Sequence, residues 1–231
     1  MGELAILIRL TLETPLSVGG AGATGAEADK MVQRDVQGRP IIPASQIKGR
    51  LRHACESLAR QLEISVCQPP HPETTCPHVD SVPKSGDGKR LCLVCRLFGS
   101  PAHQSPLRFS DLRFEPVGED SAVRPGVGVD RRRGTVQENL LFLTETVMAG
   151  AEFTRRDGDE PLPAIRGKVS REEALFLLAG LQSIQSWGGA KSRGLGWANL
   201  QVEATFDGQA LELQKEKEVL AQWLRSHRSS R

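Results

Sequence analysis

The sequence predicts an α+β fold, and three features of the chain lead to this prediction. Apolar residues alternate with other residues from Leu4 to Leu12, as in a strand with one buried face. A second apolar stripe, from Ile47 to Leu62, repeats every three or four positions, as on one side of a helix. Ser170 and Glu173 have the spacing of a helix-capping box, and a further helical stripe follows them. Strands and at least two helices therefore alternate along the chain.

Length and composition fit a folded globular chain. The 231 residues are 39% hydrophobic and 25% charged, which is ordinary for such proteins. We expect a single domain over residues 1–231. No apolar run approaches the roughly 20 residues that a membrane helix needs, and no signal-peptide pattern is found. We therefore expect a cytoplasmic protein without a membrane partner.

The elements between these features follow from turn residues and periodicity. Ser45 is a candidate N-cap for the first helix, and Gly19 to Gly25 predict a loop before it. The remaining expected elements are a short hairpin at Gln37-Gly38, a coreless insertion at 66–89, a strand at 107–114, a polar loop or hairpin at 126–137, one or two strands at 140–153, a strand at 197–206 and a short helix at 214–223 with a frayed end.

This order, βαββαβ, is that of the ferredoxin-like fold, which RRM domains share. The expected fold class is therefore α+β with a ferredoxin-like (RRM-like) core and long insertions. The insertions are a metal-binding segment at about 64–99, a β-hairpin at about 116–139 and a glycine-rich loop. A helical tail is expected at about 212–231.

Four of the five cysteines indicate a structural metal site. Cys67, Cys76, Cys92 and Cys95 are spaced C-x8-C-x15-C-x2-C in a proline-rich segment with few large apolar residues. A CxxC knuckle places two thiolates on one tetrahedral zinc, and metal binding would replace the missing core. His78 or His71 is an alternative to Cys67. Four ligands leave no open position, so the zinc would be structural. The fifth cysteine, Cys55, lies on the apolar helical stripe and is expected in the core.

A glycine-rich loop joins the second helix to the last strand. Gly188 to Gly196 contain Lys191, Ser192 and Arg193 among glycines that include Gly189 and Gly194. Glycines allow close approach of a ligand and expose backbone N–H groups, and the cations suit phosphates. The spacing is not that of the GxxxxGK[ST] nucleotide loop, so ATP binding is not expected.

Basic residues are clustered although the net charge is only +2. One cluster runs from Lys30 to Arg52 and holds six basic residues and one acid, Asp35. A second is Arg131-Arg132-Arg133, and the third is in the glycine loop. Local basic stripes on a nearly neutral chain are typical of a protein that follows a phosphate backbone, although each cluster could also be solvated surface.

Four motifs together resemble the RAMP superfamily (repeat-associated mysterious proteins). The glycine loop is similar to the C-terminal signature of that superfamily. Residues 34–52, RDVQGRPIIPASQIKGRLR, resemble a stretch of the backbone subunits of type III CRISPR effector complexes. The segments CLVCRLFG (92–99) and VDRRRGT (129–135) are similar to the cysteine knuckle and the hairpin of the same proteins. The resemblance runs from about Leu4 to Phe206.

The resemblance implies a function in RNA-guided RNA cleavage. Copies of such subunits stack along a CRISPR RNA, and each pushes its hairpin, called the thumb, through the duplex of guide and target RNA. A loop aspartate cuts the target strand at regular intervals. The matching residue here is Asp29, followed by Lys30 and Met31 where the family has Ser and Pro. Glu27 is a nearby alternative carboxylate.

The resemblance also assigns roles to other residues. Asp29 would act with Mg²⁺ or Mn²⁺ as a metal-dependent endoribonuclease. The expected partners are CRISPR RNA, complementary target RNA and other subunits of the complex, including related backbone subunits. Residues expected to contact RNA are Ser45, Lys48, Arg50, Arg52, Arg131, Arg132, Gly189, Lys191, Ser192, Arg193 and Gly194; Ser45 has helix capping as its alternative.

Three alternatives remain open. One is a non-catalytic guide-RNA scaffold in which Asp29 is inert. Another is a repeat-processing CRISPR endoribonuclease, although the cysteine knuckle and the Pro43–Arg52 block speak against it. The last is a zinc-stabilised RRM-like protein of unrelated biology.

Overall fold

The computed structural model describes residues 1–19, 28–78, 91–115 and 120–228, and it confirms the mixed α+β class. Its strands are β1 (Gly2–Leu12), β2 (Ile41–Ile42), β3 (Leu107–Phe109), β4 (Leu112–Glu115), β5 (Ser121–Asp130), β6 (Thr135–Val147), β7 (Glu152–Thr154), β8 (Arg156–Asp157), β9 (Glu160–Pro161), β10 (Ile165–Val169), β11 (Ala198–Phe206) and β12 (Gln209–Ala210). Its helices are α1 (Ala44–Gln61), α2 (Leu93–Phe98), α3 (Arg171–Gln182) and α4 (Lys217–Ser226). Short 3-10 turns lie at Pro72–Thr74 and Lys191–Arg193.

The main sheet is antiparallel and centres on β1. One edge of β1 pairs with β11, and the other pairs with β7 and β10. β7 then pairs with β4, and β10 pairs with β3. The strand expected at 107–114 is therefore broken into β3 and β4, and its neighbour is broken into β7 and β10. If β3 and β4 are counted as the second core strand and β7 and β10 as the third, the order across the sheet is fourth (β11), first (β1), third (β7 and β10), second (β4 and β3).

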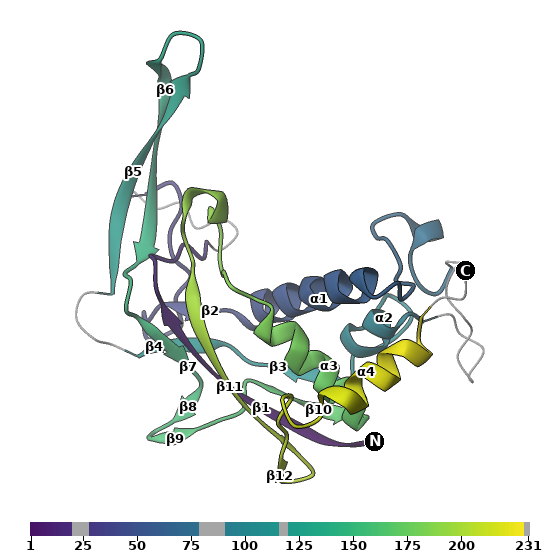
Figure 1. The fold of residues 1–231 in the computed structure, drawn as a ribbon. Coiled ribbons are helices and arrows are strands. Elements are labelled where there is room, and N and C mark those ends of the chain that lie inside the picture. The colour runs from purple at the N-terminus through teal and green to yellow at the C-terminus, as the bar shows by residue number, and fades with distance from the viewer. Residues whose placement is uncertain (20–27, 79–90, 116–119, 229–231) are drawn as a thin grey trace.

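The core lies between this sheet and the helices, which gather on one side of it (Figure 1). Alternation along β1 directs five apolar side chains, Leu4, Ile6, Ile8, Leu10 and Leu12, to this side, and each is at most 2% exposed. α1 and α3 pack closely because Gly180 of α3 leaves room for Cys55 of α1. A Cβ at position 180 would lie 2.7 Å from the Cys55 Sγ. The expected core position of Cys55 is confirmed, whereas Leu62, beyond the end of α1, is exposed.

The two long helices begin in different ways. α3 has the predicted capping box: the Ser170 hydroxyl accepts from the Glu173 N–H, and the Glu173 carboxylate accepts from the Ser170 N–H. Ser45 does not cap α1, because the N-cap is Pro43, which makes no side-chain capping bond. Asp111, at the turn between β3 and β4, accepts a 2.7 Å hydrogen bond from the Ala44 N–H instead. Asp111, 67 positions away from Ala44, thus makes the capping contact that local spacing assigned to Ser45.

A long two-stranded hairpin projects from the body of the molecule (Figure 1). It consists of β5 and β6, which pair from Ser121↔Val147 to Asp130↔Thr135 with a bulge between Val127 and Val129. Residues 140–147, which we expected to form a separate strand, continue β6. The hairpin is therefore longer than the expected one, and residues 116–119 of the prediction lie outside the described part.

The C-terminal helix α4 packs against α3. The rings of Trp223 and Phe176 lie 6.3 Å apart, and Leu220 is buried. Arg171, in the first turn of α3, makes two 2.7 Å hydrogen bonds to the Glu216 carboxylate. The tail is thus part of the core packing through Leu224, and residues 229–231 lie outside the described part. None of the described helices is long and apolar enough to span a membrane.

Candidate nucleic-acid interface and metal centre

The four predicted metal ligands come together in the structure. The sulfur atoms of Cys67, Cys76, Cys92 and Cys95 all lie within 4.8 Å of one another, and all four residues are buried. The Cys67 Sγ is 3.3 Å from the Cys95 Sγ and 3.8 Å from the Cys92 Sγ. His71 and His78, the alternative ligands, are not part of this group. Four thiols so placed can hold one metal ion such as zinc.

Local backbone geometry builds this cluster. Cys92 is the N-cap of α2, and its sulfur accepts from the Cys95 N–H at 3.4 Å. The Cys92 N–H in turn donates to the Cys76 sulfur at 3.3 Å. The helix ends at Gly99, whose φ of 86° suits glycine. Residues 91–98, which follow the coreless insertion expected at 66–89, pack into the main core.

Charge also favours a metal at this cluster. Hydrogen bonds from the thiols of Cys67 and Cys95 lower the pKa of Cys92, so one thiolate forms readily. Burial raises the pKa of Cys76, and the neighbouring sulfurs raise that of Cys95. Several thiolates would therefore repel one another in this buried site unless a cation sits among them.

Arg52 belongs to the cysteine cluster in the structure. Its guanidinium donates to the Cys95 sulfur at 3.5 Å, to the Gly99 carbonyl at 3.1 Å and to the Glu56 carboxylate at 3.1 Å. Partners around a metal ligand orient it and balance its charge. We expected Arg52 to contact guide phosphates, but its donors already bind these protein groups.

The exposed ridge of α1 contains Ser45, Gly49 and His53, spaced four residues apart. Beside the ridge, Lys48 makes no hydrogen bond or ion pair with the described residues. A Cβ at Gly49 would meet nothing within 4 Å. Glycine inside a helix costs about 1 kcal/mol relative to alanine, and no protein contact at Gly49 requires that cost. A ligand backbone lying on this ridge would explain it.

The glycine loop is anchored at its neck and open at its tip. The backbone N–H of Trp187 donates to the Gly196 carbonyl at 2.7 Å, and the backbone N–H of Gly196 donates to the Pro15 carbonyl at 2.9 Å. The Gly189 N–H, expected to face RNA, instead donates to the Ser17 carbonyl at 2.8 Å. The tip carries the exposed residues Lys191, Ser192, Arg193 and Gly194.

Two cations from different elements lie near each other between α1 and this loop. Arg50 donates to the Ser186 carbonyl at 2.7 Å, while its buried Nε has no partner. Burial lowers the pKa of Arg50. Desolvation and the charge of Arg50 lower the pKa of Lys191. Because a phosphate would relieve this repulsion, the pair is suited to an anion.

The glycine loop also reaches the hairpin. The Arg193 guanidinium lies 5.3 Å from the centre of the Phe142 ring on β6. A hollow of about 290 Å³ lies between them, lined by Arg124, Val127, Phe142, Ala190, Arg193 and Leu195 among others. Aromatic rings and guanidinium planes are the surfaces on which unpaired RNA bases stack.

Asp29 is hydrogen-bonded to Leu143, the residue of β6 that follows Phe142. Its carboxylate Oδ2 accepts from the Leu143 N–H at 2.6 Å, and its own N–H donates to the Leu143 carbonyl at 3.0 Å. These groups of Leu143 are free because they point away from β5, where Pro125 is the opposite residue. The Asp29 side chain is exposed, and its Oδ1 has no partner among the described residues.

The described residues do not build a Mg²⁺ or Mn²⁺ site around Asp29. Within the described part of the chain, the four cysteines form the only group of three or more potential ligands. Asp29 contributes one carboxylate, and Glu27, the alternative, lies outside the described residues. Magnesium usually takes one or two carboxylates and completes its shell with phosphates and water.

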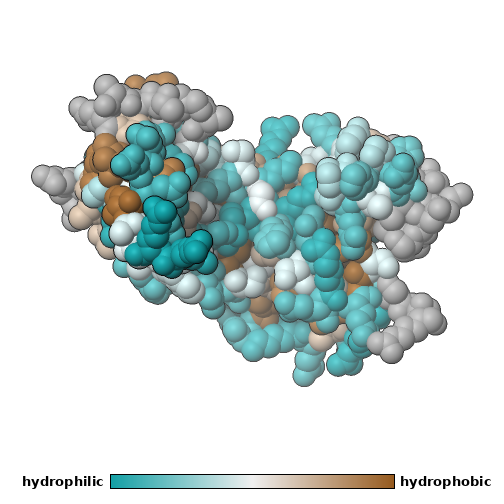
Figure 2. All heavy atoms as spheres, turned by 90° about the horizontal axis from the view of Figure 1, so that it is seen from above, coloured by the Kyte–Doolittle hydropathy of each residue, from teal (hydrophilic) through white to brown (hydrophobic). Residues whose placement is uncertain are grey.

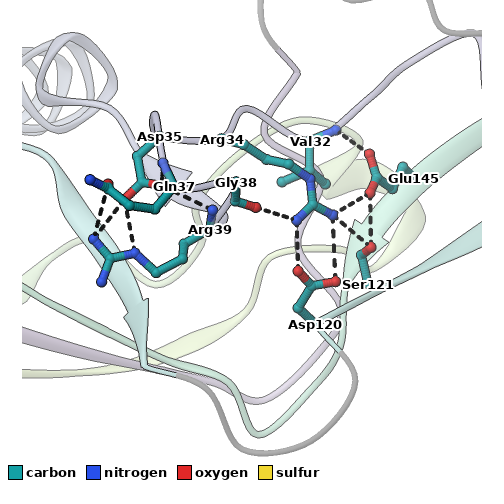
Figure 3. Close-up of polar contacts among 9 residues, drawn as sticks. All are labelled: Val32, Arg34, Asp35, Gln37, Gly38, Arg39, Asp120, Ser121 and Glu145. Atoms are coloured by element: carbon teal, nitrogen blue, oxygen red, sulfur yellow. Dashed lines mark hydrogen bonds and ion pairs between the residues drawn. The ribbon is translucent and has the colours of Figure 1, made fainter.

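A partly buried ion-pair network fixes the base of the hairpin (Figure 3). Arg34 donates to Asp120 at 2.6 Å, to Glu145 at 2.7 Å and to the Ser121 hydroxyl at 2.9 Å. Glu145 also accepts from the Val32 N–H at 2.8 Å. Arg34 was grouped with the basic stretch from Lys30 to Arg52, but its charge is compensated inside the protein.

The remaining predicted contacts lie at the hairpin tip. Arg131 and Arg132 are exposed in the turn between β5 and β6, and Asp130 accepts from the Arg132 N–H at 2.8 Å. The tip therefore presents positive charge far along the projection.

The sheet surface itself is not suited to base stacking. Phe114 pairs with Phe153, Phe206 with Leu4 and Phe109 with Ile165, and these positions face the helices. RRM domains stack bases on aromatic residues of the opposite, exposed face. Within the described strands of the main sheet, Phe114, Phe153 and Phe206 are buried and Phe109 packs against the core, so none of these rings is placed on the opposite face.

Comparison with known families agrees with this arrangement. The sequence model of the RAMP superfamily matches residues 9–199. The chain belongs to the RAMP superfamily. No curated protein matches its sequence. RAMP domains are ferredoxin-like folds, and the family points to CRISPR-associated RNA binding in general.

Sequence reasoning missed the part of this RAMP domain where its motifs meet. Residues 142–145 of β6 contact Arg193, Asp29, Lys30 and Arg34 in turn. Phe142 and Glu145 carry no local motif, since they lie in an ordinary strand pattern. Their partners are 51 and 111 residues away for Arg193 and Arg34, so only the folded chain identifies them.

Proposed function

We propose that this RAMP protein is a guide-RNA-binding backbone subunit of a type III CRISPR effector complex that cleaves the complementary target RNA with Asp29. The observation that carries the proposal is that Asp29 and the glycine loop both contact β6 of the projecting hairpin, while the same loop brings Lys191 near Arg50 of α1. An exposed carboxylate, a cation stacked on an aromatic ring and a surface of unpaired positive charge are the parts that guide binding and target cleavage need.

The guide strand is proposed to lie along the exposed ridge of α1 and the tip of the glycine loop. Lys48, Arg50 and Lys191 supply charge for its phosphates, and Ser45 and Ser192 supply hydroxyls. These contacts hold the backbone and leave the base edges free to pair with target RNA. Arg52 acts in the proposal through the cysteine cluster.

The hairpin is proposed to act as the thumb. Six of its apolar side chains are at least 45% exposed: Val123, Val127, Val129, Val136, Leu140 and Leu141. Figure 2 shows hydrophobic residues along the hairpin beside its hydrophilic tip. A projecting two-stranded ribbon with this much apolar surface is suited to a bound partner rather than to water.

Asp29 is proposed to assist attack by the 2′-hydroxyl of the target RNA. The 2′-oxygen bonds to the adjacent phosphorus, and the bond from phosphorus to the 5′-oxygen breaks. The 2′-proton passes to the Asp29 Oδ1, and water protonates the departing 5′-oxygen. The products are a 2′,3′-cyclic phosphate and a 5′-hydroxyl. Leu143 orients the carboxylate through its hydrogen bond to Oδ2.

The test is target cleavage by the assembled complex containing Asp29→Asn. Asparagine can still accept from the Leu143 N–H but is a far weaker base, so the hairpin contact survives. We expect cleavage to fall by about 100-fold or more, with guide RNA still bound. Asp159→Ala, at an exposed turn between β8 and β9, is the matched control and should cleave normally. Unchanged cleavage with Asp29→Asn would refute the catalytic role.

A scaffold without activity is the second candidate, and the Asp29–Leu143 hydrogen bond favours it. In that case Asp29 positions the hairpin, and Asp29→Ala lowers guide or target binding while Asp29→Asn does not. Measuring binding and cleavage separately for the two variants distinguishes the roles. The repeat-processing alternative requires the free chain to cut repeat RNA, which the same assay tests without other subunits.

A further inference from the structure

A cavity of about 460 Å³ lies at the turn between β3 and β4. Three arginines line it: Arg113 from β4, and Arg155 and Arg156 from the segment that leads from β7 into β8. The other lining residues are Ala44, Phe109, Ser110, Asp111, Asp157 and Leu162. None of them belongs to the proposed guide surface.

The positive charge of this cavity is poorly compensated. Asp111 is engaged with the Ala44 N–H, and no ion pair joins Asp111 or Asp157 to the three arginines in the described part of the chain. Arg113 has one acidic neighbour, Asp35, at 3.8 Å, and that carboxylate is already held by Arg39 at 2.8 Å. The arginines therefore face one another without a strong counterion.

Two further observations favour an anion in this cavity. The Arg156 Nε is buried and has no hydrogen-bond partner. A charged donor that is buried and unpaired is unfavourable. In addition, burial and the charges of Arg166 and Arg113 lower the pKa of Arg155, which holds the Pro163 carbonyl at 2.6 Å. An anion in the cavity would offset the charge of the Arg156 guanidinium and would relieve the repulsion on Arg155.

We propose that this cavity binds a phosphate group. Three guanidinium groups from two chain segments can reach several oxygens of one phosphate, and guanidinium forks match that geometry. α1 begins at Ala44 on the cavity wall, so the positive end of its helix dipole adds to the attraction. The phosphate can belong to an RNA strand, as a contact outside the guide surface, or to a small phosphate-bearing molecule.

The test follows the Arg156 Nε–H resonance in the full chain labelled with ¹⁵N-arginine, assigned by its loss in Arg156→Gln. Inorganic phosphate and a single-stranded RNA are titrated separately. A saturable shift with RNA assigns the site to a polynucleotide, and a shift with inorganic phosphate alone assigns it to a small molecule; both support the proposal. No shift with either ligand overturns it.

Binding measurements on the variant keep this site separate from the proposed function. We expect Arg156→Gln to weaken binding of whichever phosphate ligand shifts the resonance by about tenfold. Arg225→Gln, on the exposed side of α4, removes the same charge and should leave affinity unchanged. Equal affinities for wild type and Arg156→Gln would count against the site, while loss of guide binding in a Lys48 or Lys191 variant concerns the other surface.

Discussion

Arg34 holds the two strands of the hairpin to the loop that precedes α1. Its three side-chain partners, Asp120, Ser121 and Glu145, lie 86 to 111 residues away in the sequence. The Glu145 side chain is only 11% exposed, so removal of Arg34 leaves a carboxylate that water reaches poorly. The position of the hairpin, and with it of Asp29, therefore depends on this guanidinium.

Replacing Arg34 by glutamine should lower the free energy of unfolding by about 2 to 4 kcal/mol at pH 7. Arg9→Gln is the matched control. The side chains of Arg9 and its partner Glu152 are 47% and 30% exposed, so the expected cost is at most about 1 kcal/mol. Urea unfolding of the two variants measures both values. Equal costs would show that the Arg34 network is no stronger than a surface pair.

The Arg34 network should also make stability depend on pH. Burial by itself raises the pKa of Glu145, but hydrogen bonds from Arg34, Val32 and Ser121 outweigh it, and the net pKa is lowered. The hydrogen bond from Arg34 lowers the pKa of Asp120 as well. The stabilisation is therefore fully present above the pKa values of these carboxyls in the unfolded chain, near 4. It is lost as the pH falls through their lower pKa values in the folded protein. The free energy of unfolding, measured between pH 7 and pH 3, should fall less steeply with decreasing pH for Arg34→Gln than for wild type.

Lys48 and Arg52 lie four residues apart on α1 but have different surroundings. Arg52→Ala should lower metal retention and stability, because its guanidinium contacts Cys95, Gly99 and Glu56. Lys48→Ala should weaken RNA binding by about threefold to tenfold and reduce its salt dependence, with metal content unchanged. Metal analysis and RNA binding at several salt concentrations separate the two. The assignment fails if both variants lose the same property.

At the scale of the helix, two interior glycines have opposite environments. Gly180 of α3 touches α1, where an added Cβ would lie 2.7 Å from the Cys55 sulfur, whereas Gly49 of α1 has open space above it. The first glycine allows two helices to pack closely. The second leaves the helix backbone accessible from outside the protein.

The two alanine substitutions should therefore change stability in opposite directions. Gly180→Ala should destabilise the fold by about 1 to 3 kcal/mol through overpacking. Gly49→Ala should stabilise it by about 0.5 to 1 kcal/mol, yet weaken RNA binding because a methyl group then stands on the ridge. Thermal unfolding and RNA affinity are the measurements. RNA affinity that is unchanged in Gly49→Ala would remove the ridge of α1 from the interface.

At the scale of the whole molecule, the cysteine cluster joins distant parts of the chain. Cys67 and Cys76 lie before residues 79–90, and Cys92 and Cys95 begin α2, which packs on α1. Removing a bound metal with a chelator should lower the melting temperature, with the largest loss of hydrogen-exchange protection at residues 91–99. Protection in β5 and β6 should change little, and added zinc should restore the original curve. Uniform loss over the whole chain would contradict a local structural site.

Local features of the sequence determined much of this RAMP domain. The α+β class, β1, the stripe of α1, the capping box of α3 and the four clustered cysteines followed from periodicity, capping and spacing. These features depend on residues close in sequence or on strong side-chain chemistry, so they can be recognised before the chain folds. The motif resemblance likewise led to the family that the comparison shows.

Only the tertiary structure decided which charged and capping residues serve the fold and which remain open to a ligand. Arg34 and Arg52 are engaged by partners far along the chain, Asp111 replaces Ser45 at the start of α1, and β6 brings Asp29 and Arg193 to one place. The physical reason is that an arginine in a sequence has the same charge whatever faces it. Its role depends on whether folding places a carboxylate, a sulfur or open solvent within reach of its donors.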